Sequence, residues 1–250
     1  MLCANHLRES ECVQKLDPYI FKAQIKRLIL NFAMEQPKVK NTTYSATFTS
    51  ATGGLYIREF NALRPLIDRP DFRAQLKKEV LENNYLQINA QSSRRKVINN
   101  LIPRIESAFD DFWHSFSDSQ PQEQALMLFY LTLKAVPLVF DFHFGVTLPA
   151  WKGSGRTFDL FAYQMKIDEL GNRFSNVAQW SDATRRQLID IYKRILREAG
   201  FLKEESLIAP RMPDQFYFIF LRNKDPWFLE ACFVSQTERE RIINLFYSAV

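Results

Sequence analysis

Glycine, cysteine and histidine are scarce in this 250-residue chain, and each shortage excludes a class of structure. With 7 glycines and 11 prolines, the chain has too few turn residues for an all-β protein, so we expect a mainly α fold. The three cysteines, Cys3, Cys12 and Cys232, lack the spacing of metal ligands, and the three histidines lie far apart. We therefore predict no metal site and no disulfide framework, which is typical of a protein of the reducing cytoplasm.

The chain also lacks a long uninterrupted apolar run. Its first residues, MLCANHLRESECV, include acids and have no apolar core, so we expect no signal peptide. The most apolar window, Ala125–Val146, is interrupted by Lys134, Pro137 and Asp141. Its pieces are far shorter than the roughly 20 apolar residues that a membrane-spanning helix needs. We interpret this window as one central buried helix and expect no membrane partner.

Apolar residues recur at helical spacing along much of the chain. Hydrophobic residues make up 46% of the chain and charged residues 24%, as in an ordinary soluble domain. Asp17-Pro18 and Pro121 are typical of helix starts, and Gly200 is typical of a helix end. The stretch FLKEESLIAP that follows this glycine suits a short β-hairpin. We predict an N-terminal extension with one helix over residues 1–42, a helical subdomain over 43–118 and a second helical subdomain over 119–250.

Two helix starts far apart in the chain repeat one pattern, SRRKVIN at Ser93–Asn99 and TRRQLID at Thr184–Asp190. The formal net charge is only +5, so the position of the cations matters more than their number. The free amides and partial positive charge of a helix start suit a phosphate, which arginines bind as well. Both starts are therefore candidates for contact with DNA. The alternative is a solvated helix face and a coincidental repeat.

The first start carries several cations and no acid. We expect Ser92 or Ser93 to cap this helix and its apolar residues to face the core, so that the cations lie on the opposite, solvent face. The amides of Asn99, Asn100 or Gln187 can pair with base edges. The residues that we assign to DNA contact at this start are Ser92, Ser93, Arg94, Arg95, Lys96, Asn99 and Arg104.

The second start is less one-sided, because acids stand among its cations. An intrahelical pair such as Asp190 with Arg194 would neutralise part of the charge. A helix followed by a short hairpin is also the order of recognition helix and wing in a winged helix-turn-helix protein. A structural helix without DNA contact is the alternative. The residues that we assign to DNA contact at this start are Thr184, Arg185, Arg186, Lys193 and Arg194.

Motifs for catalysis are weak throughout the chain. The loop GSGR at Gly153–Arg156 lacks the GK[ST] ending of a phosphate-binding loop. Asp111 and His114 are one helical turn apart, but nothing else converges on them, and we interpret them as a surface pair. We interpret His143 as a histidine at the edge of the core. No nucleophile motif is present, so we predict no enzymatic activity, no cofactor and no small-molecule substrate.

Several of these stretches together resemble one protein family. The segment TYSATFTSATGGLYIREFNAL at Thr43–Leu63 runs from Tyr-Ser-Ala through small residues into a helix with an early acid, Glu59. The arginine-rich helix, the central apolar window and VAQWSDATRRQLIDIYKRILREAGFL follow, the last with Trp180 and Gly200 in place. The match extends over about residues 43–235. In these features the chain resembles the BrxA proteins of BREX (bacteriophage exclusion) systems.

The resemblance implies an all-helical cytoplasmic protein with helix-turn-helix-like parts and with packing likened to the NusB fold. It further implies a non-enzymatic, DNA-binding component of an anti-phage system, with double-stranded DNA and other BREX components as partners. One alternative is a NusB-like RNA-binding protein. The other is an assembly subunit that presents part of an aromatic-rich end to a partner, drawn from Phe216, Tyr217, Phe218, Phe220, Trp227 and Phe228.

Overall fold

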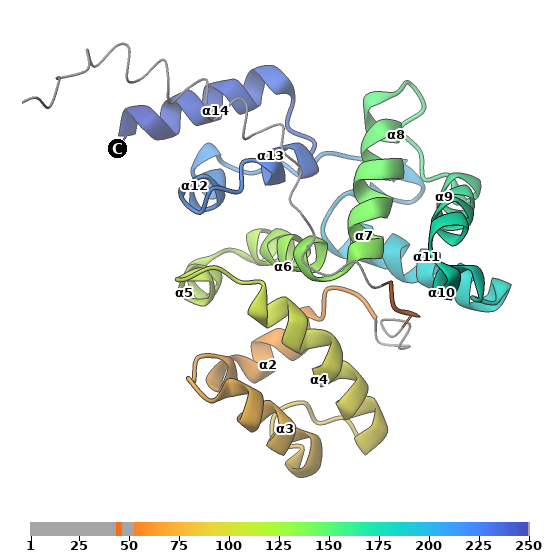
Figure 1. Cartoon of the computed structure of the whole chain (residues 1–250). Coiled ribbons are helices and arrows are strands. Elements are labelled where there is room, and N and C mark those ends of the chain that lie inside the picture. Colours follow the sequence, from red (N-terminus) through yellow and green to blue (C-terminus); the bar gives the residue numbers. More distant parts are fainter. Residues whose placement is uncertain (1–43, 47–52, 250) are drawn as a thin grey trace, which may run out of the picture. The chain divides into compact units, whose positions relative to one another are not determined.

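Helices build most of the described chain, as the scarcity of glycine and the helical spacing predict. The computed structural model describes residues 44–46 and 53–249 (Figure 1), and the predicted helix after Asp17 lies outside them. The chain divides into a unit of Met1–Gln36 and a unit of Pro37–Val250, and every described residue belongs to the second. The mainly α class is confirmed, and the described residues contain one small two-stranded sheet.

Three helices form an N-terminal group (Figure 1): α2 (Ile57–Ile67), α3 (Phe72–Glu82) and α4 (Gln91–Glu106). Their buried apolar residues include Phe60, Leu63, Leu76, Val80, Val97 and Leu101. The buried carboxylate of Glu79 holds the turn between α3 and α4, because it accepts the backbone N–H groups of Tyr85 and Leu86 at 2.8 and 2.9 Å. This turn fixes where α4 starts.

Two expected helix boundaries around α4 and α6 have different outcomes. The sequence predicts that Pro103 interrupts or restarts the arginine-rich helix, because proline has no N–H with which to continue it. Instead α4 continues through Pro103, which is exposed. The chain leaves the helix only after Glu106, and α5 (Phe112–Asp118) follows. The predicted start at Pro121 is confirmed, and the N–H of Gln120 donates to the carboxylate of Glu123 at 2.8 Å, as in a capping box.

The central apolar window is not one helix, so that prediction is wrong. Pro137 has no N–H with which to continue the helix, and Val136 before it is extended, with φ −121° and ψ 96°. The segments on either side meet at 108°. Among the described residues no single helix is long and apolar enough to cross a membrane, although this bent pair meets that criterion together. The elements are α6 (Pro121–Ala135), α7 (Pro137–Phe142), the π-helix η2 (His143–Thr147) and α8 (Leu148–Lys152).

The second arginine-rich helix and the hairpin after it are confirmed. The Oγ of Ser181 accepts the N–H of Thr184, whose side chain is half-buried, at 3.2 Å. The helix stops two residues before Gly200, which has φ 81°, and the N–H of Phe201 donates to the carbonyl of Leu196 at 2.8 Å. The elements of this region are α9 (Leu160–Arg173), α10 (Ser175–Ala178), α11 (Asp182–Glu198) and the antiparallel strands β1 (Leu202–Lys203) and β2 (Ser206–Leu207).

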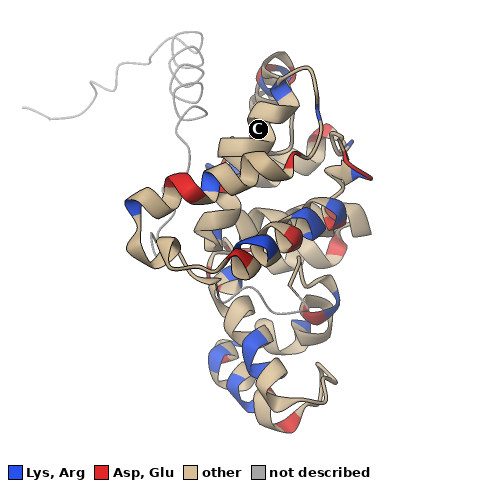
Figure 2. Ribbon diagram, turned by 90° about the vertical axis from the view of Figure 1, so that its right-hand side faces the viewer, with Lys and Arg blue, Asp and Glu red and all other residues tan. Residues whose placement is uncertain are grey.

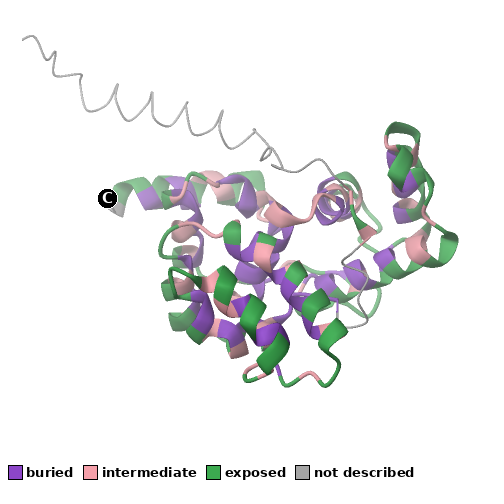
Figure 3. Cartoon of the chain, turned by 60° about the horizontal axis from the view of Figure 1, so that its bottom comes forward, coloured by how far each residue is buried: buried purple, intermediate pink, exposed green. Residues whose placement is uncertain are grey.

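The aromatic-rich end of the chain belongs largely to the core. Its helices are α12 (Asp214–Arg222), α13 (Trp227–Ala231) and α14 (Gln236–Ala249). Buried segments gather where the helices face one another (Figure 3). The rings of Phe220, Trp227 and Phe228 surround Tyr130 of α6 at centroid distances of 5.0, 5.6 and 5.2 Å. A partner surface drawn from this end was one alternative, and its buried members are Phe216, Tyr217, Phe220, Trp227 and Phe228, while Phe218 is half-buried.

Candidate nucleic-acid interface

The arginine-rich helix α4 starts earlier than its serines predict. Its first residue is Gln91, and the preceding Ala90 has no side chain that can cap the helix. The N–H of Ser93 already donates to the carbonyl of Ala90 at 3.0 Å, which places both serines inside the first turn. The prediction that Ser92 or Ser93 is the N-cap is therefore wrong. The side chain of Ser92 is exposed and that of Ser93 is half-buried.

Arg94 does not lie on the solvent face. Its side chain is 7% exposed, and its Nε donates to the carbonyl of Val80 at 2.8 Å. Its Nη1 donates to the carbonyls of Ile88 and Asn89 at 2.5 and 3.0 Å. The last turn of α3 and the α3–α4 connection thus leave three carbonyls that one guanidinium satisfies. The expected position of Arg94 on the wet face is wrong, because this side chain holds the loop that leads into its own helix.

Arg104 is also buried, with 1% of its surface exposed. Its Nη1 donates to the carbonyl of Gly54 at 2.8 Å, and its guanidinium carbon lies 5.0 Å from the ring centroid of Tyr56. Nε and Nη2 have no hydrogen-bond partner. Burial lowers the pKa of Arg104 to about 10. Its expected position on the solvent face is wrong as well.

Helical spacing already contains the signal for both buried arginines. Arg94 precedes Val97 by three residues, and Arg104 follows Leu101 by three, so all four share one face of α4. The charge of the two arginines, rather than their position, led us to expect solvent exposure. Burial of a guanidinium is tolerable where carbonyl groups replace the lost water.

Four side chains make up the outer face of α4: Ser92, Arg95, Lys96 and Asn99 are all exposed. They recur at i, i+3, i+4 and i+7, so they follow one another along the helix. Arg95 and Lys96 have no carboxylate partner among the described residues, and α4 contains no acid before Glu106. Lys and Arg occur on successive helices of this N-terminal group (Figure 2). A polyanion along this face would meet unneutralised cations.

The repeat at α11 has the same division between its two arginines. The Nε of Arg185 donates to the carbonyl of Trp180 at 3.1 Å, and its Nη1 lies 2.6 Å from the carboxylate of Asp168. The first arginine of each start therefore folds back onto the chain before its helix. The second arginine of each, Arg95 or Arg186, is exposed. The repeated sequence thus combines one structural and one surface arginine.

The remaining cations of α11 are engaged within the protein. Lys193 pairs with Glu205 at 2.6 Å. Asp190 lies 3.9 Å from Arg186, rather than beside Arg194 as we expected. The Nη1 of Arg194 donates to a backbone carbonyl before α2 at 2.9 Å. These contacts leave α11 with less free positive charge than α4.

Two of the predicted DNA contacts meet instead at a glycine pair before α2. Arg104 donates to the carbonyl of Gly54, and Arg194 donates to that of Gly53. The carboxylate of Glu198 accepts the N–H of the next residue at 2.6 Å, and burial raises its pKa. A Cβ on Gly54 would lie 2.6 Å from that carboxylate, so a larger residue would displace the Glu198 side chain from its contact. This junction of α4, α11 and the segment before α2 was not predicted, although the glycine pair marked it.

The histidines in the described ranges form no metal or acid–base site. His114 is exposed and lies 3.7 Å from Asp118, rather than pairing with the acid three residues before it. His143 lies within the core rather than at its edge, with its Nε2 2.8 Å from the carbonyl of Ala231 and its Nδ1 3.1 Å from the hydroxyl of Tyr192. Burial lowers the pKa of His143 to about 4. Residues 44–46 and 53–249 contain no group of three potential metal ligands.

The chain is similar in sequence and in fold to known proteins. A curated relative, BREX protein BrxA of Bacillus cereus (strain H3081.97), is 24% identical over 169 residues, which cover 67% of this chain and 83% of that protein. The crystal structure of an uncharacterized protein from Magnetospirillum magneticum has a similar fold, with a TM-score of 0.63 and 21% identity, over 77% of this chain and 99% of that chain. The sequence model of the BrxA family matches residues 42–225, from the segment before α2 to the residues after α12. Because that match spans most of the chain, the resemblance is confirmed and the chain belongs to the BrxA family.

Proposed function

We propose that this protein is a non-enzymatic, DNA-binding component of a BREX anti-phage system, and that it acts in the cytoplasm on duplex DNA. The family match and the name of the Bacillus cereus relative support the system. One observation carries the DNA contact: the outer face of α4 has no acid, and its Arg95 and Lys96 have no carboxylate partner among the described residues.

Phosphate contact explains why cations stand at the start of α4. The helix dipole places partial positive charge at this end, so the cations are unfavourable there without an anion. A phosphate backbone removes the conflict, with Arg95 and Lys96 as charged donors and Ser92 with the first-turn amides as neutral donors. Asn99 lies one turn further along, where its amide can reach a base edge. Affinity then derives mainly from phosphates and specificity from few groups.

In this proposal α11 has the smaller part. Among the described residues its exposed Arg186 has a single ion-pair contact, at 3.9 Å with Asp190, and it can turn towards a phosphate. The order of α11 and the hairpin β1–β2 supports a winged arrangement, with the hairpin beside the duplex. Arg94, Arg104 and Arg185 act indirectly, because they fix the segments that lead into the two helices.

The test is binding of a fluorescently labelled duplex across a salt series. Loss of two phosphate contacts in Arg95→Ala/Lys96→Ala should reduce the slope of log affinity against log salt by about 1.8. Arg186→Ala should reduce it by about 0.9 or less. The control Arg222→Ala/Lys224→Ala removes two exposed cations at the end of α12, outside α4, α11 and the hairpin, and should leave the slope unchanged.

A slope that falls equally in the control would contradict contact through α4. A titration with a single-stranded RNA probe, made in parallel with the duplex, distinguishes the RNA-binding alternative from DNA binding. Tighter binding to that RNA than to duplex DNA would favour a NusB-like function.

Assembly with other BREX proteins is a second candidate function, supported by two exposed apolar side chains. Phe161 is 65% exposed and Met165 is 51% exposed, one turn apart on α9. Phe161→Ser/Met165→Ser should abolish co-purification with the other BREX proteins without a change in duplex affinity. Leu81→Ser is the control, because this residue is 68% exposed on another helix. Retained co-purification in the double variant would exclude this surface.

A further inference from the structure

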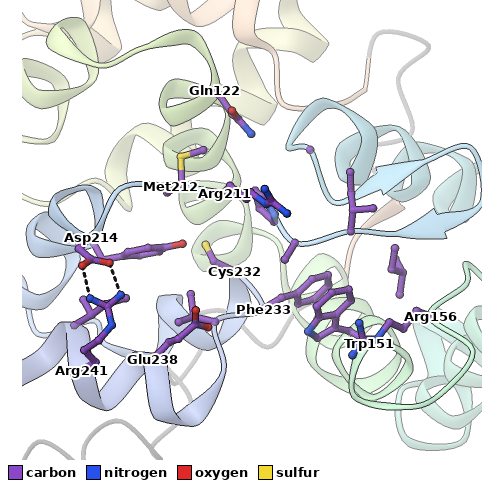
Figure 4. Close-up of a pocket in the computed structure, with 18 residues that line it drawn as sticks. Gln122, Trp151, Arg156, Arg211, Met212, Asp214, Cys232, Phe233, Glu238 and Arg241 are labelled. Carbon is purple, nitrogen blue, oxygen red and sulfur yellow. Dashed lines mark hydrogen bonds and ion pairs between the residues drawn. The ribbon is translucent and has the colours of Figure 1, made fainter.

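A cavity of about 880 Å³ lies apart from the outer face of α4, between α6, α8, the segment after β2, α12 and α14 (Figure 4). Its volume is within the roughly 300–1,000 Å³ of small-molecule sites. Its lining combines apolar side chains with a few donors, including Gln122 and Tyr217, and with arginines. None of its lining residues belongs to α4 or α11, and Leu207 is the one lining residue from the hairpin β1–β2, so the proposed phosphate contacts do not account for the cavity.

Three arginines and two acids, Asp214 and Glu238, line this cavity, and one of the arginines is paired with an acid. Arg241 forms a two-point pair with Asp214 at 2.6 and 2.8 Å, drawn at one end of the cavity in Figure 4. Arg156 and Arg211 are exposed and have no carboxylate partner among the described residues. These two guanidinium groups give the cavity unpaired positive charge with the fork geometry that suits phosphate.

Arg156 is held in place by an aromatic stack. Its guanidinium carbon lies 4.2 Å from the ring centroid of Trp151, and that ring stacks on Phe233 at 4.8 Å and 6° (Figure 4). Arg156 and Phe233 both adopt left-handed backbone conformations, with φ of 45° and 63°. Such conformations are unfavourable for residues with side chains and recur at ligand clamps. The stack fixes a flat cation and leaves its N–H edge free to donate.

The inner wall of the cavity suits a ring with polar edges. Phe233 and Cys232 are buried there, and the hydroxyl of the largely buried Tyr217 has no hydrogen-bond partner within the described ranges. A hydroxyl that reaches a cavity without a protein partner can donate to a ligand atom. An apolar wall in a cavity that also contains two arginines thus favours a ligand that has both a ring and a phosphate.

We propose that this cavity binds an organic phosphate of nucleotide size, with its phosphate on Arg211, its ring against Phe233 and Tyr217, and Arg156 on the Trp151 stack as a second cation of the lining. A free nucleotide and the phosphorylated end of a nucleic-acid strand present this same chemistry. The inference goes beyond the proposed DNA contact, because it uses residues of a different surface.

Isothermal titration with AMP, ATP, inorganic phosphate and a short 5′-phosphorylated single strand tests the proposal. We expect a nucleotide or the strand end to bind and Arg211→Ala to weaken that binding about tenfold or more. Arg156→Ala and Tyr217→Phe should weaken it as well. Arg222→Ala, an exposed arginine on α12 outside the cavity, is the matched control and should bind as the wild type does.

Each outcome decides the proposal. Binding of AMP or ATP assigns the site to free nucleotides, and binding of the strand alone assigns it to strand ends. No binding by any probe, or equal affinity in folded Arg211→Ala, overturns it. Arg95→Ala/Lys96→Ala should keep full affinity for these probes, so failure of the duplex experiment and failure of this one are distinguishable. Near-UV circular dichroism verifies that each variant is folded.

Discussion

Arg94 and Arg95 are neighbours in the chain, but their side chains have opposite surroundings. Arg94 is buried and donates to three backbone carbonyls, whereas Arg95 is exposed and has no carboxylate partner among the described residues. A buried acceptor that loses its donor costs about 1–3 kcal/mol. The two arginines should therefore affect different properties of the protein when they are removed.

Arg94→Ala should lower the free energy of unfolding by about 2–4 kcal/mol, because three carbonyls lose their donor and a buried side chain is lost. Arg95→Ala should change it by less than about 0.5 kcal/mol, since the residue is exposed. Urea unfolding followed by circular dichroism measures both. Equal losses in the two variants would show that Arg94 is not the structural member of the pair.

Arg104 and Glu198 allow a second prediction at the residue scale. Arg104→Met should leave the free energy of unfolding within about 1 kcal/mol of the wild type or raise it, since a buried charge with two unpartnered nitrogens is replaced by apolar volume. Glu198→Ala should lower it by about 2–3 kcal/mol, because the N–H of Leu55 loses its acceptor. Thermal and urea unfolding test the pair. A larger loss for Arg104→Met than for Glu198→Ala would contradict this account.

The sequence predicts the candidate site only in part, for a physical reason. Residue spacing fixes which face of α4 each side chain occupies, and it places Arg94 with Val97 and Arg104 with Leu101. Whether a cation on that face is buried depends on carbonyls supplied from elsewhere, such as Ile88. Those carbonyls become neighbours only in the folded chain. The exposed half of the predicted site needed no such partner.

At the scale of elements, two prolines within stretches of helical spacing have different effects. Proline removes the N–H that would bind the carbonyl four residues earlier. For Pro103 that carbonyl belongs to the exposed Asn99, which water can reach, and the helix continues. For Pro137 it belongs to the buried Leu133, and the chain turns by 108° instead. The sequence therefore predicted α11 and its hairpin, which depend on neighbouring residues in the chain. It did not predict the bend at Pro137, which depends on the burial of Leu133 in the folded chain.

At two glycines, substitution by alanine should change the free energy of unfolding in opposite directions. Gly200→Ala should lower the free energy of unfolding by about 1 kcal/mol, because φ is 81° there while the nearest neighbouring atom lies 3.8 Å from the new Cβ. Gly171→Ala, inside α9, should raise it by about 0.5–1 kcal/mol, since its Cβ makes ordinary contacts from 3.5 Å. Chemical denaturation of both variants provides the comparison. A stabilising Gly200→Ala would contradict the role of the left-handed helix end.

At the scale of the whole molecule, one chain of polar groups crosses an otherwise aromatic core. Thr147 Oγ1 lies 2.5 Å from the hydroxyl of Tyr192 and 2.9 Å from that of Tyr163. The Tyr192 hydroxyl also meets Nδ1 of His143, whose Nε2 donates to the carbonyl of Ala231. The chain joins η2, α9, α11 and α13. Satisfied buried groups of this kind restrict how the helices can pack against one another.

Protonation of His143 should therefore loosen the whole core. Burial lowers its pKa from 6.5 to about 4, so between these values the unfolded chain binds a proton that the folded chain does not. Stability should fall as pH falls through this window, by up to about 3 kcal/mol from this group. Urea unfolding at pH 7 and pH 5 should show a smaller pH-dependent loss in His143→Gln than in the wild type, while the control His114→Gln should match the wild type, since His114 is exposed. Parallel losses in all three proteins would show that His143 does not set the acid sensitivity of the fold.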